Sequence, residues 1–261
     1  MLYLKEAFVR RVKDMLVDVH CHLTDSVLKE RLPDILRDAR NAGVSAMVTS
    51  GLGYEDCLEV LKISDYRTVF PSFGVMPYEL EGYEMVLDLI EKNSRRIVAI
   101  GEVGLDFYLG ARTDRELQRK VFKEFISLSI NLDLPIIVHS RSAGKYALEV
   151  LSECGAKDVI MHAFDGSASH AMSGVRNGYF FSIPPSVVRS AQKQKLVERV
   201  QLENILLESD APALPPKPGE VNVPSNVKIS AEAVSRIKGI PLWKVEEVTT
   251  ENALRVFRIK V

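Results

Sequence analysis

Cysteine is scarce in this sequence, and its scarcity bears on the compartment in which the protein works. The 261 residues include three cysteines, Cys21, Cys57 and Cys154, an odd number without close pairing. A framework of disulfide bonds is excluded, because proteins that depend on one carry many closely spaced cysteines. The count predicts a reducing compartment, and we expect the protein to be cytoplasmic.

Long apolar runs are also missing. A helix that crosses a bilayer needs about 18 consecutive apolar residues, and no such stretch occurs. Arg10 and Arg11 stand near the start, but the apolar run that a secretion signal requires does not follow them. The sequence therefore predicts neither a membrane anchor nor a secretion signal.

A surplus of charge of one sign is the third absence. The chain has 34 Lys and Arg against 35 Asp and Glu, and 46% of its residues are hydrophobic. Such a composition excludes a disordered chain. It also argues against a general nucleic-acid coat, so any nucleic-acid site has to be local.

The first residues differ from the rest of the chain. Leu4, Phe8 and Val12 recur every four residues, which predicts a short amphipathic helix. The first strand-like run follows Met15. We therefore expect an N-terminal extension over residues 1–14 and one folded unit over residues 15–261.

Short apolar runs alternate with longer amphipathic stretches along the rest of the chain. Most of the runs are β-branched or aromatic, which suits strands of a parallel sheet covered on both faces. The predicted strands are Leu16–Val19, Ala46–Ser50, Val69–Phe73, Ile97–Ile100, Ile136–Val138, Val159–Met161, Tyr179–Ile183 and Ile205–Leu207. The predicted helices between them include Leu28–Ala42, Tyr83–Asn93, Asp114–Asn131 and Val187–Val200.

Eight strands alternating with helices predict an α/β fold, a (β/α)₈ TIM barrel in a single domain. The alternative is an open doubly wound sheet, which usually has a glycine-rich loop after its first strand. Here the first strand runs into His20 and His22 instead, which favours the barrel. The proline-rich stretch Ala211–Val227 is predicted either to wall the active site or to cross the surface. Trp243 is expected to pack into the core from a C-terminal helix.

Enzymes with this fold carry their chemistry at the carboxyl ends of the strands. The polar residues at these ends are His20, His22, Glu102, His139, Arg141, His162, Glu208 and Asp210. They include four of the five histidines in the chain. Residues two apart on a strand face the same side, so His20 and His22 are expected to enter the barrel mouth together, with Cys21 facing the helices.

Imidazoles and carboxylates that converge in this way suit Zn²⁺, Mn²⁺, Fe²⁺ or Co²⁺. The four histidines together with Glu102 and Asp210 make six ligands, which are too many for one tetrahedral ion with an open position. They fit two ions that share a bridging carboxylate and a bridging water. The alternative is a chance gathering of hydrogen-bonded histidines.

Five segments together resemble a known family. They are Asp18–His22 (DVHCH), Gly101–Asp106 (GEVGLD), Val138–Arg141 (VHSR), Met161–Gly166 (MHAFDG) and Glu208–Pro212 (ESDAP). Their types and order resemble the TatD-type deoxyribonucleases of the amidohydrolase superfamily. The resemblance runs from about Met15 to Phe257. It implies a metal-dependent barrel that hydrolyses DNA phosphodiester bonds from 3′ ends, with DNA as the partner.

Ligand roles follow from the resemblance, residue by residue. His20, His22 and Asp210 would hold one divalent ion, and His139 and His162 would hold a second. Glu102 would bridge the two. The ions would be Zn²⁺, Mn²⁺ or Mg²⁺, and four histidines favour the softer ions over Mg²⁺. No obligate protein partner is indicated.

The expected mechanism places acids and bases around an activated water. Asp210 would hold that water and accept its proton as general base. Arg141 is expected either to contact a substrate phosphate or to pair with Glu102 or Asp106. Asp106 is expected to cap the following loop or to orient a histidine. Asp18 and Glu208 are expected to be structural or to support the ligands.

The sequence departs from the family pattern after the third strand. Many relatives have the segment GVHP, whereas Gly74–Pro77 reads GVMP. Met76 can neither coordinate a hard cation nor donate a hydrogen bond to phosphate. The basic motif that many relatives carry after strand eight is replaced here by Glu220 and Val221. Both changes weaken the case for DNA as the substrate.

Two alternatives therefore stand beside the nuclease. The same metal barrel would act on a small ester, lactone, amide or phosphoester, although Glu102 stands where the phosphotriesterase-like enzymes carry a carboxylated lysine. A non-catalytic binding barrel ranks lowest, because a degenerate enzyme usually loses its ligands first and all six are present.

Overall fold

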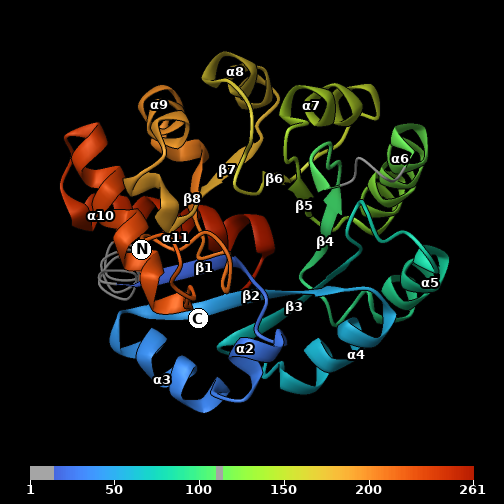
Figure 1. The fold of residues 1–261 in the computed structure, drawn as a ribbon, viewed down its shortest axis with the longest axis horizontal. Helices are drawn as coiled ribbons and strands as arrows, with labels where there is room; N and C mark the ends of the chain where they lie inside the picture. The colour runs from blue at the N-terminus through green and yellow to red at the C-terminus, as the bar shows by residue number, and fades with distance from the viewer. Residues whose placement is uncertain (1–14, 110–113) are drawn as a thin grey trace, which may run out of the picture.

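Eight parallel strands form one sheet in sequential order (Figure 1). The computed structural model describes residues 15–109 and 114–261. The strands are β1 (Leu16–Cys21), β2 (Val44–Leu52), β3 (Val69–Gly74), β4 (Ala99–Gly104), β5 (Ile136–His139), β6 (Val159–Met161), β7 (Phe180–Ile183) and β8 (Ile205–Leu207). The predicted (β/α)₈ barrel is confirmed, because the strands follow one another around the barrel with helices between them.

Helices surround the strands as an outer ring (Figure 1). They are α2 (Ser26–Lys29), α3 (Leu32–Asn41), α4 (Tyr54–Ile63), α5 (Tyr83–Asn93), α6 (Arg115–Leu132), α7 (Gly144–Glu153), α8 (Ala168–Arg176), α9 (Ala191–Arg199), α10 (Val227–Lys238) and α11 (Leu242–Phe257). Short 3₁₀ turns are η2 (Pro185–Val188), η3 (Leu202–Asn204) and η4 (Pro224–Asn226). None of the described helices is long and apolar enough to cross a membrane.

Two predicted helices differ from the structure: one is interrupted near a proline, and the other begins later, after a serine. The predicted helix Leu28–Ala42 is broken into α2 and α3, because Pro33 lacks the N–H that a continuous helix needs and clashes with the preceding turn. The predicted helix Val187–Val200 begins instead as η2. Its α-helical part, α9, begins after Ser190, whose hydroxyl accepts a hydrogen bond from the backbone N–H of Lys193.

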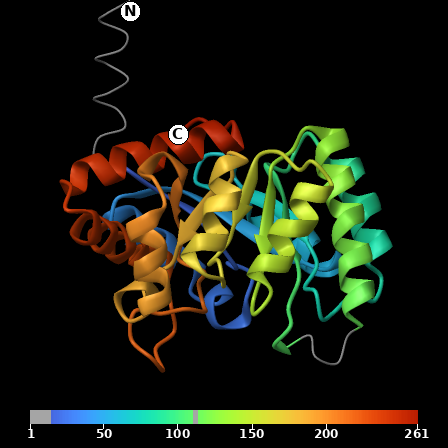
Figure 2. The same cartoon turned by 90° about the horizontal axis from the view of Figure 1, so that it is seen from above.

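Two hydrophobic layers hold the barrel together. The larger lies between the strands and the surrounding helices. The smaller fills the interior with apolar residues of all eight strands, Val19 and Ile137 among them, and with Val256 and Phe257 of α11. Figure 2 shows α11 lying across one end of the barrel. The C-terminal helix thus closes the amino end and leaves the carboxyl end for a site.

The ring closes between β1 and the segment after β8. The backbone N–H of Asp210 donates to the carbonyl of His20 at 2.9 Å, and that of His22 donates to the carbonyl of Ala211 at 2.8 Å. Asp18, which is fully buried, accepts hydrogen bonds from the backbone N–H and the hydroxyl of Ser209 at 2.8 and 2.5 Å. Asp18 therefore fixes the position of the chain beside Asp210, as a structural acid.

Two further predictions concern the chain ends. The predicted N-terminal helix lies outside the described residues. The predicted packing of Trp243 into the core is wrong, since its side chain is 50% exposed while Val245 of the same helix is buried. On a helix, residues two positions apart point to different sides, so Trp243 does not share the buried face of Val245.

Candidate metal centre

The alternation of side chains along the strands places polar groups at the barrel mouth. On four strands, an apolar residue of the interior is followed two positions later by a polar one. The pairs are Ile137 and His139, Ile160 and His162, Phe180 and Ser182, and Leu206 and Glu208. Because side chains two apart share a face, the same alternation that fills the amino half of the barrel lines its carboxyl half with polar groups.

Two other polar residues enter the mouth through irregularities in their strands. The register of β1 against β2 shifts between Asp18 and Cys21, next to His20. The register of β4 against β5 shifts between Ile100 and Val103, next to Glu102. Bulges of this kind redirect side chains and are common beside active sites. Glu102 consequently lies within β4, whereas the sequence pattern had predicted it at the strand's end.

Gly104 lets β4 and β5 approach closely at the mouth. It has a φ of 150°, and a Cβ at this position would lie 2.1 Å from the carbonyl oxygen of His139. Any side chain would therefore push β5 away and displace His139.

Glu102 lies at the centre of four imidazoles. Its Oε2 is 3.3 Å from Nε2 of His20 and 3.5 Å from Nε2 of His22. Its Oε1 is 3.6 Å from Nε2 of His162 and accepts a hydrogen bond from Nδ1 of His139. Each carboxylate oxygen thus faces one pair of histidines.

Asp210 lies beside the same imidazoles. Its Oδ1 is 3.6 Å from Nε2 of His20 and 3.7 Å from the same atom of both His22 and His162. Its φ is 57°, in the left-handed region that few residues other than glycine, asparagine and aspartate adopt. Such backbone strain is often found at functional sites.

A partner at the second ring nitrogen orients each histidine. Nδ1 of His20 is 3.2 Å from the Ser50 hydroxyl, and Nδ1 of His22 is 3.3 Å from the Ser50 carbonyl. The other two partners are acids. Asp106 Oδ2 is 2.9 Å from Nε2 of His139. The fully buried Glu208 has Oε2 2.8 Å from Nδ1 of His162.

Asp106 and Glu208 each contact a histidine and further hydrogen-bond donors. Asp106 does both things expected of it, because its Oδ1 also accepts hydrogen bonds from the backbone N–H groups of Tyr108 and Leu109 at 2.8 and 2.6 Å. Glu208 also accepts from the Ser182 hydroxyl at 2.5 Å and the Ala163 N–H at 3.0 Å. Carboxylates behind histidines in this way are typical of metal sites.

The donor set fits divalent cations. Three overlapping groups of side chains have ligand atoms within 4.8 Å of one another: His20, His22 and Glu102; Glu102, His139 and His162; and His20, His162 and Asp210. Nε2 of His20 is buried and has no hydrogen-bond partner in the described part of the chain. An unpaired buried nitrogen is costly, and a metal ion would satisfy it.

The pKa values of the clustered groups are shifted strongly by their neighbours. Burial disfavours charge on His139 and His162, yet the carboxylate of Glu102 helps raise the pKa of His139 to about 9, and those of Glu208 and Asp210 help raise the pKa of His162 to about 10. Burial also opposes the charge of Glu102, but the neighbouring imidazoles hold its pKa well below its usual range. Metal ligands must be deprotonated, so protons and cations compete for these nitrogens.

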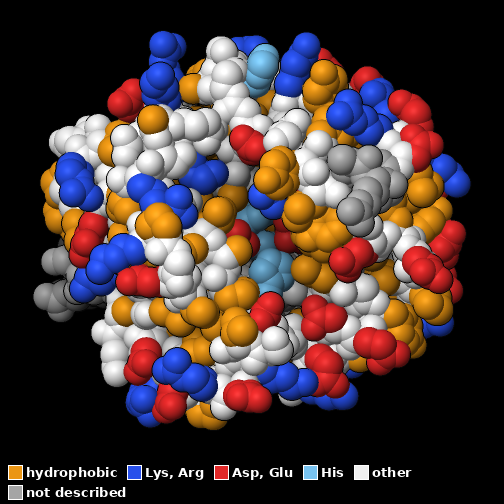
Figure 3. Space-filling view, viewed as in Figure 1, with side chains coloured by type: hydrophobic (Ala, Val, Ile, Leu, Met, Phe, Trp, Pro, Cys, Tyr) orange, Lys and Arg blue, Asp and Glu red, His pale blue; other side chains and the backbone are white. Residues whose placement is uncertain are grey.

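A cavity of about 630 Å³ opens onto this cluster. Figure 3 shows the imidazoles at the bottom of a hollow on this face, with acidic side chains beside them. Its lining includes His22, Met76, Tyr78, Glu102, Leu109, His139, Arg141, His162, Asp165, Gln192, Lys193, Asp210, Ala213 and Leu214. Since Ala213 and Leu214 belong to the proline-rich stretch, that stretch walls the cavity. Its volume is within the range of small-molecule sites.

Among the described residues, two cations line the cavity, and the sequence indicated one of them. Arg141 is exposed, and its guanidinium lies 4.2 Å from the centre of the Tyr108 ring. No salt bridge joins it to Glu102 or Asp106, both of which are described. Lys193 has no motif that points to it, because it stands on α9, 31 positions after His162 along the chain.

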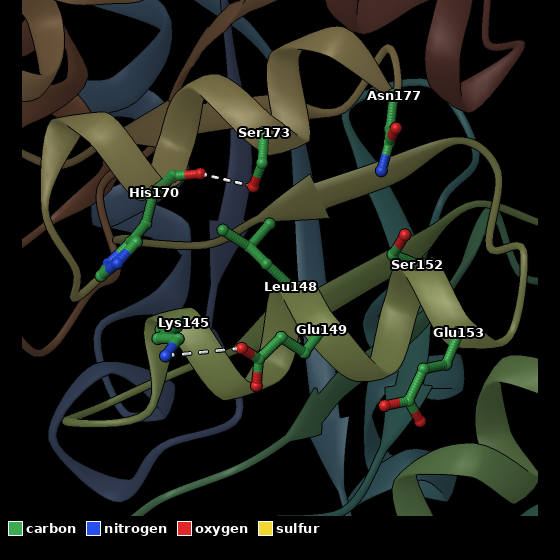
Figure 4. Close-up of a pocket in the computed structure, with 8 residues that line it drawn as sticks. All are labelled: Lys145, Leu148, Glu149, Ser152, Glu153, His170, Ser173 and Asn177. Carbon is green, nitrogen blue, oxygen red and sulfur yellow. Dashed lines mark hydrogen bonds and ion pairs between the residues drawn. The ribbon is translucent and has the colours of Figure 1, made fainter.

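A second cavity, of about 440 Å³, lies in the outer helix layer between α7 and α8 (Figure 4). Its polar groups engage one another: Lys145 Nζ is 3.6 Å from Glu149, and the Ser173 hydroxyl donates to the carbonyl of His170 at 2.7 Å. His170, the fifth histidine, is exposed here on α8 and is not among the grouped ligands.

Comparison with known proteins agrees with the resemblance seen in the sequence. The family model described as TatD related DNase matches residues 17–258. The chain is 44% identical to the human deoxyribonuclease TATDN3, over 93% of this chain and 94% of that protein. It is 32% identical to the uncharacterized metal-dependent hydrolase YabD of Bacillus subtilis, over 94% of this chain and 100% of that protein.

A solved structure shares the fold. The TatD homologue YJJV from Escherichia coli superposes with a TM-score of 0.89 at 23% identity, covering 95% of this chain and 100% of that one. The family match over nearly the whole chain and the identity to the relatives above together show which family the chain belongs to. This chain belongs to the TatD-related DNase family.

Proposed function

We propose that this protein is a divalent-metal-dependent deoxyribonuclease that removes nucleotides from the 3′ ends of DNA with two bound ions. One observation carries the two-ion proposal. Each oxygen of Glu102 faces its own pair of imidazoles, His20 and His22 on one side and His139 and His162 on the other. A single carboxylate between two histidine pairs suits a bridging ligand.

The six side chains have separate tasks in this proposal. His20, His22 and Asp210 would hold one ion, His139 and His162 the other, and Glu102 both. When bound, the ions supply Lewis acidity, which stabilises charge on a phosphoryl oxygen and makes water easier to deprotonate. Their identity would be Zn²⁺ or Mn²⁺ rather than Mg²⁺, because four imidazoles are borderline-soft ligands.

Asp210 would serve as the general base. Burial opposes its charge, but the imidazoles of His162, His22 and His20 keep its pKa below the usual value. The carboxylate is therefore ionised at neutral pH and ready to take a proton from the attacking water. At 7% exposure it lies at the floor of the cavity, where a substrate phosphate would lie against it.

Arg141 would bind the DNA backbone at the rim of the cavity. The Tyr108 ring holds its guanidinium in place from one side, and the planar fork matches phosphate oxygens. We expect Arg141→Ala to raise the KM for DNA about tenfold, the usual worth of a hydrogen bond to a charged group. The change in kcat should stay within threefold.

Steady-state kinetics at fixed ionic strength would measure the effect of Arg141→Ala. Arg95→Ala is the matched control, because it removes the same charge from an exposed position in the turn before β4, at the amino end of the barrel. A KM that does not distinguish the two variants would remove Arg141 from the binding site.

The proposed function itself is tested by elemental analysis and DNA digestion on one preparation. We expect about two ions per chain, and release of the labelled nucleotide first when a short DNA carries its label at the 3′ end. The same DNA labelled at its 5′ end should shorten stepwise. Internal fragments without early 3′ release would contradict an exonuclease, and fewer than one ion after reloading would contradict the metal centre.

A second substrate class is favoured by Met76. This side chain lines the cavity and cannot donate to phosphate, and Leu109, Ala213 and Leu214 add apolar surface beside it. A small phosphoester or lactone would use such a wall. Hydrolysis of chromogenic small esters by a metal-loaded preparation that leaves DNA intact would favour this class over the nuclease.

A further inference from the structure

Lys193 is a buried ammonium on the wall of the active-site cavity. Its residue is 8% exposed, although lysine is among the residues least often buried. Nζ donates one hydrogen bond, to the carbonyl of Ala163 at 3.0 Å. An ammonium carries three donors, so two N–H groups have no acceptor among residues 15–109 and 114–261.

In the described part of the chain, no carboxylate pairs directly with this ammonium. Among the described residues, no salt bridge within 4.0 Å includes Lys193. Burial lowers the pKa of its amine, and the more distant carboxylates of Glu208, Asp165 and Asp210 act against that change. A buried charge without a partner is costly, so buried charges are usually paired. An anionic ligand in the cavity would supply the partner that the described residues do not.

The residues around Lys193 belong to the lining of the same cavity. Lys193 lines the cavity together with His162, Asp165 and Asp210. Its neighbour Gln192 is also in the lining, but both donors of that amide are in use, to the carbonyls of Phe164 at 3.2 Å and Gly166 at 2.6 Å. Lys193 thus has spare donors on the side of the cavity formed by α9.

We propose that Lys193 is a phosphate-binding residue whose ammonium donates to a phosphate oxygen of the substrate beside Asp210. That the substrate is DNA rests on the proposed function. That Lys193 binds an anion rests on the geometry of this chain. Lys193 on α9 and Arg141 after β5 would then supply positive charge to the substrate from two separate elements. DNA binding would not depend on the basic motif that is missing after β8.

A purely structural role is the rival explanation. Through Ala163, Lys193 ties α9 to the loop that follows His162, and Gln192 ties α9 to the same loop by two hydrogen bonds. If Lys193 acted through this loop alone, Gln192→Ala would have the same effect. If Lys193 binds phosphate, loss of its charge would matter and loss of the Gln192 amide would not.

The test measures inorganic phosphate binding by calorimetry on the metal-loaded protein, with melting temperature as a readout of folding. Lys193→Met removes the charge and keeps an unbranched chain. Lys193→Gln also removes it and retains an amide donor for Ala163. We expect both to weaken phosphate binding about tenfold to a hundredfold. Lys195→Met, exposed on the same helix, should leave it within twofold.

Three results would overturn the proposal: phosphate affinity unchanged in Lys193→Gln, an equal loss in Gln192→Ala, or no phosphate binding by the unmodified protein. The KM for DNA should rise in Lys193→Gln by the same factor as the phosphate Kd. The unmodified protein could bind phosphate, lose that binding in Lys193→Gln, and still not cleave DNA. That result would keep Lys193 as an anion site and reject the nuclease, so the two failures are distinguishable.

Discussion

Glu102→Gln is expected to lose bound metal and DNA hydrolysis together, with the rate falling roughly a thousandfold or more. Glu102 is 2% exposed and presents one oxygen to each pair of imidazoles. Glutamine keeps one oxygen but replaces the other by an NH₂ group, which cannot bind a cation. Metal Lewis acidity is worth several kcal/mol, and about 1.4 kcal/mol corresponds to tenfold in rate.

Elemental analysis of the purified variant, followed by its rate on labelled DNA, measures this prediction. Glu232→Gln is the control, because it makes the same change on the exposed side of α10. Circular dichroism would confirm that the barrel is intact. If Glu102→Gln retained two ions per chain, Glu102 would not bridge them, and the two-ion proposal would have to place its shared ligand elsewhere.

Period-two alternation is the reason that so much of the site could be predicted from sequence. His139 and His162 follow inward-facing isoleucines by two positions, so that once the strands were recognised the direction of both rings was determined. The same rule predicted that His20 and His22 share one side and that Cys21 faces the helices, and Cys21 does lie in the helix-facing layer. On β1, however, Val17 and Val19 face the interior, and the register shift between Asp18 and Cys21 is what turns His20 rather than Cys21 into the mouth. The fold followed from the order of eight short apolar runs.

What sequence could not predict depends on irregular backbone and on distant contacts. Glu102 was expected from the family resemblance to bridge the ions, but the strand pattern placed it at the end of its strand. The register shift that turns its side chain into the mouth from within β4 could not be predicted from the sequence. Lys193 looks like an ordinary surface lysine of a helix, and its burial depends on how α9 packs over the loop after His162. Arg141 lines the cavity as the sequence led us to expect, but its contact with Tyr108 depends on the course of residues 105–109 after β4.

Asp210→Asn separates proton transfer from metal binding and from folding. We expect kcat to fall about 10²- to 10⁴-fold, the usual contribution of a general base, while the KM for DNA stays within twofold. Asparagine keeps an oxygen that can face the imidazoles. It also tolerates the left-handed backbone at this position, where φ is 57°. The backbone bond that closes the barrel, from the N–H of residue 210 to the carbonyl of His20, is unaffected.

Rates of Asp210→Asn must be compared at measured metal content, because the carboxylate lies within 3.7 Å of three imidazole nitrogens. Asp88→Asn, exposed on α5, is the matched control and should behave as the unmodified protein does. A variant that kept its ions and most of its kcat would reject Asp210 as the base. A variant that lost its ions would show that the carboxylate acts first as a ligand. Only retained metal with a lost kcat supports proton transfer, because neither metal loss nor misfolding accounts for that combination.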